Sequence, residues 1–590
     1  MKNFFSSLLA TIIGILIMTF ILFLILMGVI AVSTSGEAPE LKENTIVFAR
    51  FNSAISDRAD ENPLTRLMSS NPFAEEAMGL DQILKDLKKA AEDENVRGIF
   101  MNLSTVPAGF ATLSEIRDGL LQFKESGKFI YAYADTYTQK GYYLASAADS
   151  IFMTPEGMFL FSGMNAEIVF FKNALDKAGI EMQVVKHGSY KSAAEQFTRS
   201  SLSPENREQI EGYVGAIWDK YISDVSESRG ISPEALNAFA DEMKSADSEN
   251  LLSAGLIDGL IYYDEMLSLM KEKTGVEEAD DLEAIKLASY KDVVVNKEKK
   301  AYSRDKVAVI YAMGMVVDGN SGEGTIGSER ISRAIRKARR DETVKAIVLR
   351  VNSGGGSAIA SDVIYREVKL AAEAKPVVAS MGDVAASGGY YISAPADTIV
   401  ASPGTITGSI GVVYQMPNMK SLMNEKIGVT TDVVKTNTHA DLLSLFDPLD
   451  PEERQIIQHS VDNTYEAFVN VVAEGRGMSP EAVDRIAGGR VWAGTDALEI
   501  GLIDLFGGLE RSIELAAEMA GLESYRVQSL PKLEDPVTKL MKELTGGAAT
   551  RSEKILRKTL GPNYSIYREL QDAKQTGGLQ ATMPFKLRVY

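Results

Sequence analysis

The sequence predicts an α/β fold formed by a tandem duplication of one domain, preceded by one N-terminal transmembrane helix. Short apolar runs alternate with segments of helical spacing, and this pattern occurs twice along the chain. Strands with few polar faces that alternate with helices are typical of a parallel sheet covered by helices. The length of 590 residues is also far more than one hydrophobic core usually supports.

The transmembrane helix is predicted from the segment between Phe4 and Val32, which carries no charge and is rich in Leu, Ile, Phe and Met. At about 1.5 Å per residue, such a helix exceeds the roughly 30 Å hydrocarbon core of a bilayer. It is also longer than the apolar region of a cleavable signal peptide, about 7–15 residues. We therefore expect residues 1–38 to be an uncleaved anchor. Lys2 indicates a cytoplasmic N-terminus, with the bulk of the protein on the other side of the membrane.

The duplication is visible when the chain is aligned with itself at an offset of 248 residues, the difference between positions 383 and 135. "DTYTQKGYYLASAAD" then matches "DVAASGGYYISAPAD", and further on "RGISPEA" matches "RGMSPEA". We predict a first copy over residues 39–300, a second copy over 301–528 and a tail over 529–590. Within the tail, the apolar stretch "MPFKLRVY" is expected to dock against the rest of the molecule.

The elements of the second copy are predicted in order from their periodicity. "VKAIVLRVN", "KPVVASMGD" and "TIVASP" predict strands, whereas "AIASDVIYREVKLAAEA" predicts a helix and "SGGYYISAPAD" a short one. The stretch "RVNSGGGSA" predicts a turn from a strand into a helix.

The composition narrows the possible chemistry. A formal net charge of −19 argues against nucleic-acid binding, because such proteins neutralise phosphates with Lys and Arg. The absence of cysteine excludes thiolate nucleophiles, disulfides and thiolate metal ligands. The three histidines, His187, His439 and His459, include no i, i+4 pair of the kind that binds metal on a helix.

Ser387 is the first candidate for catalysis. It lies in "AASGG" at a predicted strand-to-helix junction, where small neighbours would let a substrate backbone approach the hydroxyl. Free amides at the start of the helix could bind a developing oxyanion. The same small residues also suit tight helix packing, and the motif alone does not separate the two interpretations. The first copy has Gln139 at the aligned position.

The glycine run Gly354, Gly355 and Gly356 is the second candidate element. Its bare amides, directly after a strand, could point at the oxygen of a tetrahedral intermediate. It has neither the sequence of a phosphate loop nor that of a dinucleotide fingerprint. The first copy reads "STVPAGF" here, so it lacks both the serine and the glycine run. These two differences indicate one working half and one supporting half.

A serine nucleophile needs a base, and Lys191 in "GSYKSAAEQFTR" is our candidate. Burial in an apolar pocket can lower the pKa of a lysine and leave its amine neutral. From the residues alone, an ordinary exposed lysine is the favoured interpretation, and Lys186 competes equally for the role of base. His187 and His439, which lie in the aligned segments "VVKHGSYKSAA" and "VVKTNTHADLL", are weaker candidates.

Four motifs then show a family resemblance. "LRVNSGGGSAIASDVI", "GDVAASGGYYISAPAD", "TITGSIGVV" and "GSYKSAAEQFTR" together resemble the signal peptide peptidase A family (SppA, or protease IV) in its long, duplicated form. The resemblance covers about residues 1 to 525. It implies a ClpP/crotonase-like fold in each copy and a serine–lysine dyad peptidase. The family's usual Ser-Pro-Gly-Gly is replaced here by Ser-Gly-Gly-Gly, which puts the rigidity of that loop in question.

The resemblance implies a role for each candidate residue. Ser387 of the second copy would be the nucleophile and Lys191 of the first copy its base, with Ser409 hydrogen-bonded to the lysine. The amides of Gly388 and of one glycine of the run, most simply Gly356, would form the oxyanion hole. No metal and no cofactor are implied.

The resemblance also implies a biological setting. The substrates would be apolar peptides, above all cleaved signal peptides left in the membrane, and the enzyme would be a homotetramer. It would span the bacterial cytoplasmic membrane once, through residues 4–32, with its catalytic domains on the periplasmic side.

Two other functions stay open at this point. One is a scaffold that binds apolar peptides without cutting them, and the joint presence of Ser387, Lys191 and Ser409 argues against it. The other is a crotonase-like acyl-CoA enzyme, against which an extracytoplasmic location argues.

Overall fold

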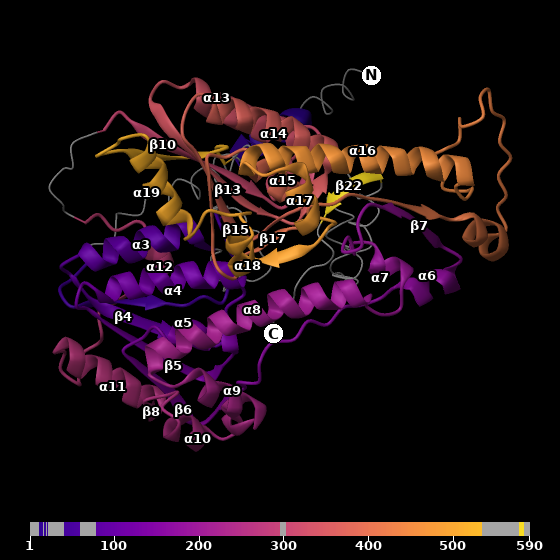
Figure 1. Ribbon diagram of the computed structural model, residues 1–590. Helices are drawn as coiled ribbons and strands as arrows, with labels where there is room; N and C mark the ends of the chain where they lie inside the picture. The colour runs from indigo at the N-terminus through magenta and orange to yellow at the C-terminus, as the bar shows by residue number, and fades with distance from the viewer. Residues whose placement is uncertain are drawn as a thin grey trace.

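The computed structural model describes residues 11–15, 17–18, 20–21, 41–59, 78–295, 303–533 and 578–582. Over these ranges the chain forms two α/β units, the first coloured indigo to magenta and the second red to yellow in Figure 1. The duplicated α/β architecture predicted from the sequence is confirmed. The more specific ClpP/crotonase-like fold stays a prediction.

The first copy is built on a parallel sheet with the strand order β8-β6-β5-β4-β1-β9. Its strands are β1 (Thr45–Ala49), β4 (Val96–Asn102), β5 (Phe129–Tyr137), β6 (Ser150–Phe159), β8 (Gly259–Leu260) and β9 (Ala284–Lys286). Its helices are α3 (Leu80–Glu92), α4 (Phe110–Lys124), α5 (Gln139–Ala145), α6 (Lys172–Ala178), α7 (Glu195–Thr198), α8 (Pro204–Arg229), α9 (Pro233–Asp241), α10 (Ser248–Ser253), α11 (Tyr263–Thr274) and α12 (Leu287–Tyr290).

The second copy repeats this plan in the order β19-β17-β15-β13-β10-β21, with β16 paired to β15 and β20 paired to β16. Its strands are β10 (Lys306–Met313), β13 (Val344–Ser353), β15 (Val377–Ala386), β16 (Thr398–Ala401), β17 (Ile406–Gly408), β19 (Val491–Ala493), β20 (Leu505–Phe506) and β21 (Arg526–Leu530). Its helices are α13 (Ser328–Arg340), α14 (Ala358–Ala372), α15 (Gly388–Ser393), α16 (Pro451–Arg476), α17 (Pro480–Ile486), α18 (Gly494–Glu499) and α19 (Leu509–Met519). The strands and helices predicted from the sequence of this copy are present, as β13, α14, β15, α15 and β16.

A third sheet joins the two copies, in the order β12-β11-β14-β22-β18-β7. Its strands are β7 (Glu181–Lys186), β11 (Met315–Val317), β12 (Thr325–Gly327), β14 (Gly355–Ser357), β18 (Val413–Asn418) and β22 (Gly578–Thr582). The first copy supplies β7, which pairs antiparallel with β18 of the second copy. The glycine run predicted as a simple turn therefore contains a strand, because the extended backbone of β14 pairs on both of its edges.

Two long helices make the duplication plain. Helices α8 and α16 each have 26 residues and each begin with proline, directly after a residue whose side chain caps the helix. Each is followed by a glycine in the left-handed region, Gly230 with φ 67° and Gly477 with φ 61°. Figure 1 shows α8 running along the second copy as well as the first, and α8 contacts β19 there.

The interface between the copies holds buried charge. Arg350 of β13 is fully buried and donates to Asp57 and to Glu115 of the first copy, each at 2.6 Å. Burial raises the pKa of Glu115, whereas Arg350 opposes that rise. Asp383 of β15 accepts hydrogen bonds from the amide and the hydroxyl of Thr112, at 2.9 and 2.7 Å. These contacts fix the second copy against the first.

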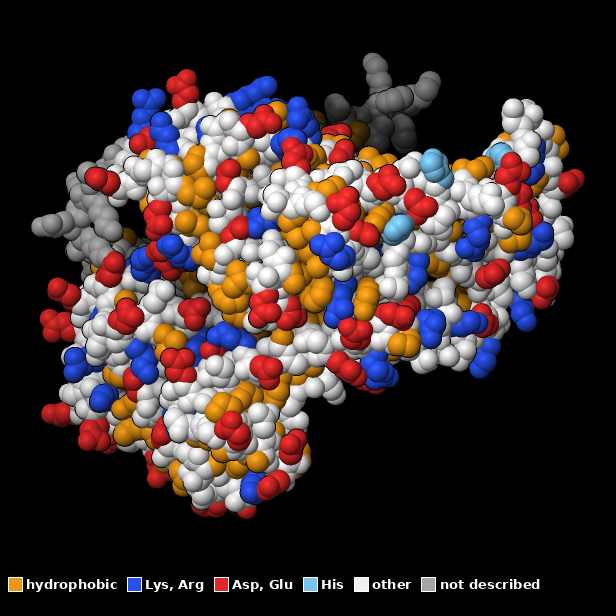
Figure 2. Space-filling view, in the orientation of Figure 1, with side chains coloured by type: hydrophobic (Ala, Val, Ile, Leu, Met, Phe, Trp, Pro, Cys, Tyr) orange, Lys and Arg blue, Asp and Glu red, His pale blue; other side chains and the backbone are white. Residues whose placement is uncertain are grey.

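The two predicted end segments are described only in part. Most of the predicted anchor and the stretch "MPFKLRVY" lie outside the described residues. Within the described ranges, no helix has both the length and the apolar character needed to cross a membrane. Strand β21 pairs with β10 and continues to Leu530, across the predicted start of the tail at residue 529. On the face drawn in Figure 2, acidic and basic side chains are interspersed.

Candidate active site

Ser387 lies between strand β15 and helix α15, at the strand-to-helix junction that the sequence predicts. Its backbone has φ 56° and ψ −117°, which a residue with a Cβ adopts only under strain. Its amide donates to the carbonyl of Gly408 at 2.8 Å, and its side chain is completely buried. The fold therefore holds this serine in one fixed and costly conformation.

Lys191 of the first copy reaches this serine from the loop that follows β7. The Nζ atom of Lys191 lies 2.8 Å from Oγ of Ser387 and 3.1 Å from both the carbonyl oxygen and Oγ of Ser409. The pairing of β7 with β18 carries the loop across to the second copy. The structure thus brings together the three side chains that the sequence singled out.

Burial lowers the pKa of Lys191 well below its usual value. The side chain is fully buried, and its hydrogen-bond partners are the two serines, which carry no negative charge to stabilise an ammonium group. A neutral amine at neutral pH can accept a proton from a serine hydroxyl.

Ser409 holds the lysine from the second copy. It has φ 51°, and its amide donates to the carbonyl of Arg490 at 2.7 Å. Among the described residues, the non-glycine residues with positive φ are Asn44, Met243, Ser387 and Ser409. Ser387 and Ser409 both contact the Nζ atom of Lys191, so two of these four strained residues lie in the candidate active site.

Glycines that the sequence analysis did not single out form the pocket of Lys191. A Cβ on Gly489 would lie 2.6 Å from the Cα and Cβ of Lys191, and one on Gly411 would lie 3.2 Å from its Cδ. A Cβ on Gly188 would lie 2.3 Å from the carbonyl oxygen of Gly488. The adjacent glycines Gly488 and Gly489 in "AGGR" are the sequence signal that could have indicated this close approach. Only glycine lets two backbones come so near.

Gln209 of α8 is a second feature that the sequence analysis missed. Its Nε2 donates to Oγ of Ser192 at 2.9 Å and lies 3.3 Å from the carbonyl of Tyr190, so it touches both neighbours of Lys191. Its Oε1 accepts from the amide of Val491 in the second copy at 3.0 Å. This buried amide therefore links the lysine loop to the opposite copy.

The glycine run lies beside Ser387. A Cβ on Gly388 would be 3.2 Å from the amide nitrogen of Gly356, so the two residues predicted for an oxyanion hole are neighbours. The amide of Gly355 donates to Oγ of Ser353 at 3.1 Å, which favours Gly356 over Gly355 for that role. A Cβ on Gly356 would lie 2.0 Å from the carbonyl oxygen of Val316, so glycine is required there.

The competing bases are engaged elsewhere. The Nζ atom of Lys186 lies 3.1 Å from the carbonyl of Lys191. His187 contacts Asp462 at 2.8 Å and stacks on Tyr465, with ring centroids 3.8 Å apart. The other two histidines lie beside Glu452 and Asn463.

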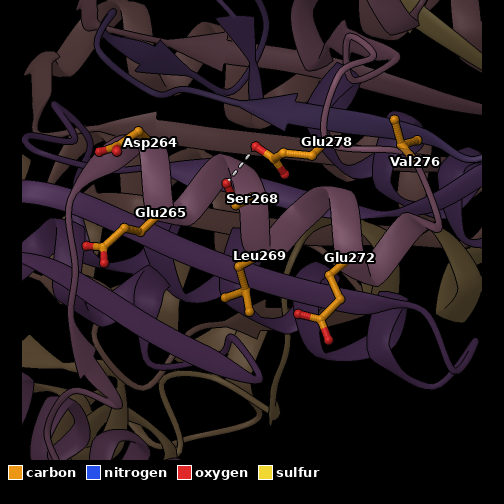
Figure 3. A pocket seen from close by; sticks show the side chains of 7 residues that line it. All are labelled: Asp264, Glu265, Ser268, Leu269, Glu272, Val276 and Glu278. Atoms are coloured by element: carbon orange, nitrogen blue, oxygen red, sulfur yellow. Dashed lines mark hydrogen bonds between the residues drawn. The ribbon is translucent and has the colours of Figure 1, made fainter.

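A cavity among the described residues lies away from this site, along helix α11. Its volume is about 560 Å³, and Figure 3 shows four carboxylates and Ser268 around it, with Ser268 donating to Glu278 at 3.0 Å. Within the described ranges, no group of three or more His, Cys, Asp or Glu side chains could hold a metal ion. This acidic cavity offers no nucleophile and base pair.

A buried serine in hydrogen-bond contact with a lysine whose pKa is lowered by burial is the arrangement of nucleophile and base that serine peptidases of the Ser/Lys type use. The model of peptidase family S49 matches residues 122–277 and 369–523, once in each copy and more than half of the chain together. The chain therefore belongs to peptidase family S49.

Sequence similarity to known proteases supports this family assignment. The chain is 35% identical over 511 residues to "Serine protease SPPA, chloroplastic" of Arabidopsis thaliana, covering 86% of this chain and 74% of that protein. It is also 35% identical over 502 residues to "Protease 4" of Salmonella typhi, covering 84% and 78%. The predicted resemblance to the long, duplicated form is confirmed. A ClpP1 point mutant from Listeria monocytogenes matches 35% of this chain and 94% of its own chain, at 15% identity and with a TM-score of 0.24.

Proposed function

We propose that this serine peptidase is an endopeptidase with a Ser387–Lys191 dyad. The observation that carries the proposal is the 2.8 Å contact between Lys191 Nζ and Ser387 Oγ in a fully buried setting. Nucleophile and base come from different copies, which accounts for the loss of the serine and the glycine run from the first copy.

The proposed reaction proceeds in two stages. The neutral amine of Lys191 takes the hydroxyl proton of Ser387, and Oγ attacks the carbonyl carbon of the scissile bond. The amides of Gly388 and Gly356 bind the resulting oxyanion, and the ammonium group returns the proton to the leaving amine. A water molecule, deprotonated by the same amine, then hydrolyses the acyl-enzyme ester. Ser409 accepts from the ammonium group through its carbonyl and hydroxyl oxygens.

The proposed substrates are apolar peptides, above all cleaved signal peptides in a bilayer, with residues 4–32 as the anchor of the enzyme. Support comes from the described helical residues between 11 and 21, several of which are large, apolar and exposed, including Ile12, Ile15 and Phe20. In this proposal the catalytic domains lie on the periplasmic side of a bacterial cytoplasmic membrane.

We also propose that copies of the chain assemble head to tail into a tetramer. The support is a pairing that one copy makes and the other lacks. In the second copy, β18 pairs with β7. The first-copy residues aligned with β18, 165–170, form no strand in the described structure, and Val169 there is 57% exposed.

The missing partner has a counterpart in the sequence. Strand β7 reads "EMQVVK", and the second copy contains "TTDVVK" at residues 430–435, where Val434 is 99% exposed. If residues 430–435 of one chain pair with 165–170 of the next as β7 pairs with β18, each chain offers one donor and one acceptor strand. Such heterologous contacts close into a ring of four when the rotation between neighbouring chains is one quarter of a turn. Light scattering of Val434→Asp should then report monomers, and an unchanged tetramer would reject this interface.

The function is tested by hydrolysis of a quenched Leu- and Ala-rich peptide by the full chain in detergent. We expect Ser387→Ala to lower kcat by at least about 10⁴-fold. Ser393→Ala is the matched control, because Ser393 is equally buried on α15 but donates to the carbonyl of Gly389. Equal rates for the parent chain and Ser387→Ala would reject the dyad. Peptide binding without hydrolysis in the parent would favour the scaffold, and saturable CoA binding would favour the acyl-CoA enzyme.

A further inference from the structure

Strand β22 lies between two strands of the second copy that are distant from it in sequence. Figure 1 shows it in yellow, below the middle of α16 and near one end of β7. On one edge it pairs antiparallel with β14, and on the other edge it pairs antiparallel with β18. The register on the β14 side is Gly355 with Thr582, Gly356 with Ala581 and Ser357 with Gln580, and on the β18 side it is Val413 with Gln580, Tyr414 with Leu579 and Gln415 with Gly578.

The two flanking strands border the active site. Strand β14 contains Gly356, whose amide lies beside Gly388, the residue after Ser387. Strand β18 begins two residues after Gly411, against which the side chain of Lys191 packs. A peptide held between these strands therefore runs between the oxyanion glycine and the pocket of the lysine.

The chemistry of β22 fits that of a bound peptide. Adding a strand to a sheet is a common mode of peptide recognition, in which main-chain hydrogen bonds provide affinity. The segment Gly-Leu-Gln-Ala-Thr carries no charge and has small and apolar residues, as the proposed substrates do. Its register sets Ala581 opposite Gly356, at the level of the oxyanion site. Ser387, which must meet its substrate, is completely buried while β22 is in place.

We propose that Gly578–Thr582 occupies the groove in which substrates bind, as a tethered competitive inhibitor of the same chain. This inference rests on the proposed peptidase function of Ser387. Residues 534–577 tether the segment, and a tether of this kind gives an effective concentration of the order of millimolar. A substrate must displace the segment, so the tether raises KM and leaves kcat unchanged.

The test compares two substitutions in the full chain. Gln580 pairs with β14 on one edge and β18 on the other, so Gln580→Pro removes a donor from the middle of the sheet. We expect KM for the quenched peptide to fall about tenfold in Gln580→Pro, with kcat unchanged, given the tether's millimolar effective concentration. Gln580→Ala keeps the N–H group and should keep most of the inhibition.

A truncated chain controls for the possibility that the proline substitution disturbs folding. A chain that stops after residue 577 should also show the lower KM, and a synthetic peptide of residues 578–582 should raise it again in a competitive manner. A KM equal to that of the parent in both variants, with hydrolysis still dependent on Ser387, would overturn the inference and leave the peptidase intact.

A binding experiment separates the two proposals if no Ser387-dependent hydrolysis is found, an outcome that rejects the peptidase function. The labelled 578–582 peptide is then titrated by fluorescence anisotropy into Ser387→Ala chains that carry Gln580→Pro or Gln580→Ala. Tighter binding to the proline variant supports occupation of the groove by β22. Equal binding to both overturns it.

Discussion

The two copies differ at the position of the proposed nucleophile. In the second copy Ser387 faces the amine of Lys191. In the first copy the side chain of the aligned Gln139 forms hydrogen bonds with backbone groups of the same copy. Its Oε1 accepts from the amides of Ser162 and Gly163, at 2.9 and 3.0 Å, and its Nε2 donates to the carbonyl of Gly163 at 2.8 Å. The first copy thus fills with one side chain the space that the second copy leaves for a lysine from elsewhere.

The oxyanion position differs in the same way. Where the second copy has Gly388 beside Gly356, the first copy has Lys140, whose Nζ donates to the carbonyl of Ala108 at 3.0 Å. Burial lowers the pKa of Lys140. The Lys140 side chain therefore lies at the position that corresponds to the proposed oxyanion hole of the second copy, so this position of the first copy has no such hole.

The backbone also follows the chemistry. Ser387 and Ser409 have positive φ, whereas their first-copy counterparts, Gln139 and Phe161, are not among the residues that do. The shared fold therefore does not itself demand the strained conformation. The strain coincides with the proposed catalytic side chains and is absent at the aligned positions of the first copy, where other residues stand.

The largest effect should come from removing the side chain that crosses between the copies. Lys191→Met keeps the length of the side chain without an amine, and we expect kcat to fall about 10⁴-fold. Lys186→Met is the matched control and should lose less than tenfold, because that amine contacts a carbonyl and not Ser387. Steady-state peptide hydrolysis measures both. The opposite order of the two effects would assign the base to Lys186.

The next effect concerns the contact that holds the copies together. Arg350 has Asn102 as its counterpart in the first copy, so the buried arginine is peculiar to the second. Arg350→Met leaves Asp57 and Glu115 buried without their partner, and we expect a loss of about 3–5 kcal/mol of unfolding free energy. Urea denaturation measures it, with the half-exposed Lys345 of the same strand as the control in Lys345→Met. Equal stability of the two variants would mean that the copies are held by other contacts.

The pH dependence sharpens the comparison between the two halves. Because burial lowers the pKa of Lys191, the amine is neutral above that lowered value, and kcat/KM should rise about tenfold per pH unit below it and then level off. Between the lowered pKa and the ordinary value of about 10.4, the unfolded chain binds a proton that the folded chain lacks, so this group makes stability rise with pH. Lys191→Met should lose that slope. A flat rate from about pH 5 to 9 would contradict a lysine base.

The smallest effect on activity is expected at the counterpart of the nucleophile. Gln139→Ala should change kcat less than twofold, because it lies outside the reacting atoms. It leaves the amides of Ser162 and Gly163 without their acceptor, so we expect a loss of about 1–3 kcal/mol in stability. Ser387→Ala should reverse this pattern, with activity lost and stability kept. Chemical denaturation and hydrolysis of both variants give the comparison, which fails if Gln139→Ala is inactive while folded.

The sequence was sufficient for the features that depend on local pattern or on repetition. The repeat defined the two copies, and periodicity identified β13, α14 and β15. Ser387, Lys191 and Ser409 were chosen from their motifs and lie together, although their catalytic roles stay predictions. The sequence was insufficient wherever distant backbones meet. The crossing of β7 to β18, the glycine pocket of Lys191 and the bridge made by Gln209 depend on packing between copies, which no periodicity encodes.

The short strand β22 shows the same limit in another form. Its five residues have no alternating apolar pattern, and its extended conformation comes from the two edges that it joins. The motif "VVK" occurs at the end of β7 and again at residues 433–435. This repeat could have indicated that the second copy has a segment that corresponds to β7.

The position of Lys191 and Ser387 on opposite copies makes hydrolytic competence a report on completed folding. In the proposed mechanism, a nascent chain that has been synthesised only as far as residue 300 has the base but no nucleophile, and an isolated second copy has the nucleophile but no base. The reactive pair exists only after β7 has docked on β18. If Ser387 and Lys191 act as proposed, a chain that is not completely folded cannot hydrolyse peptides.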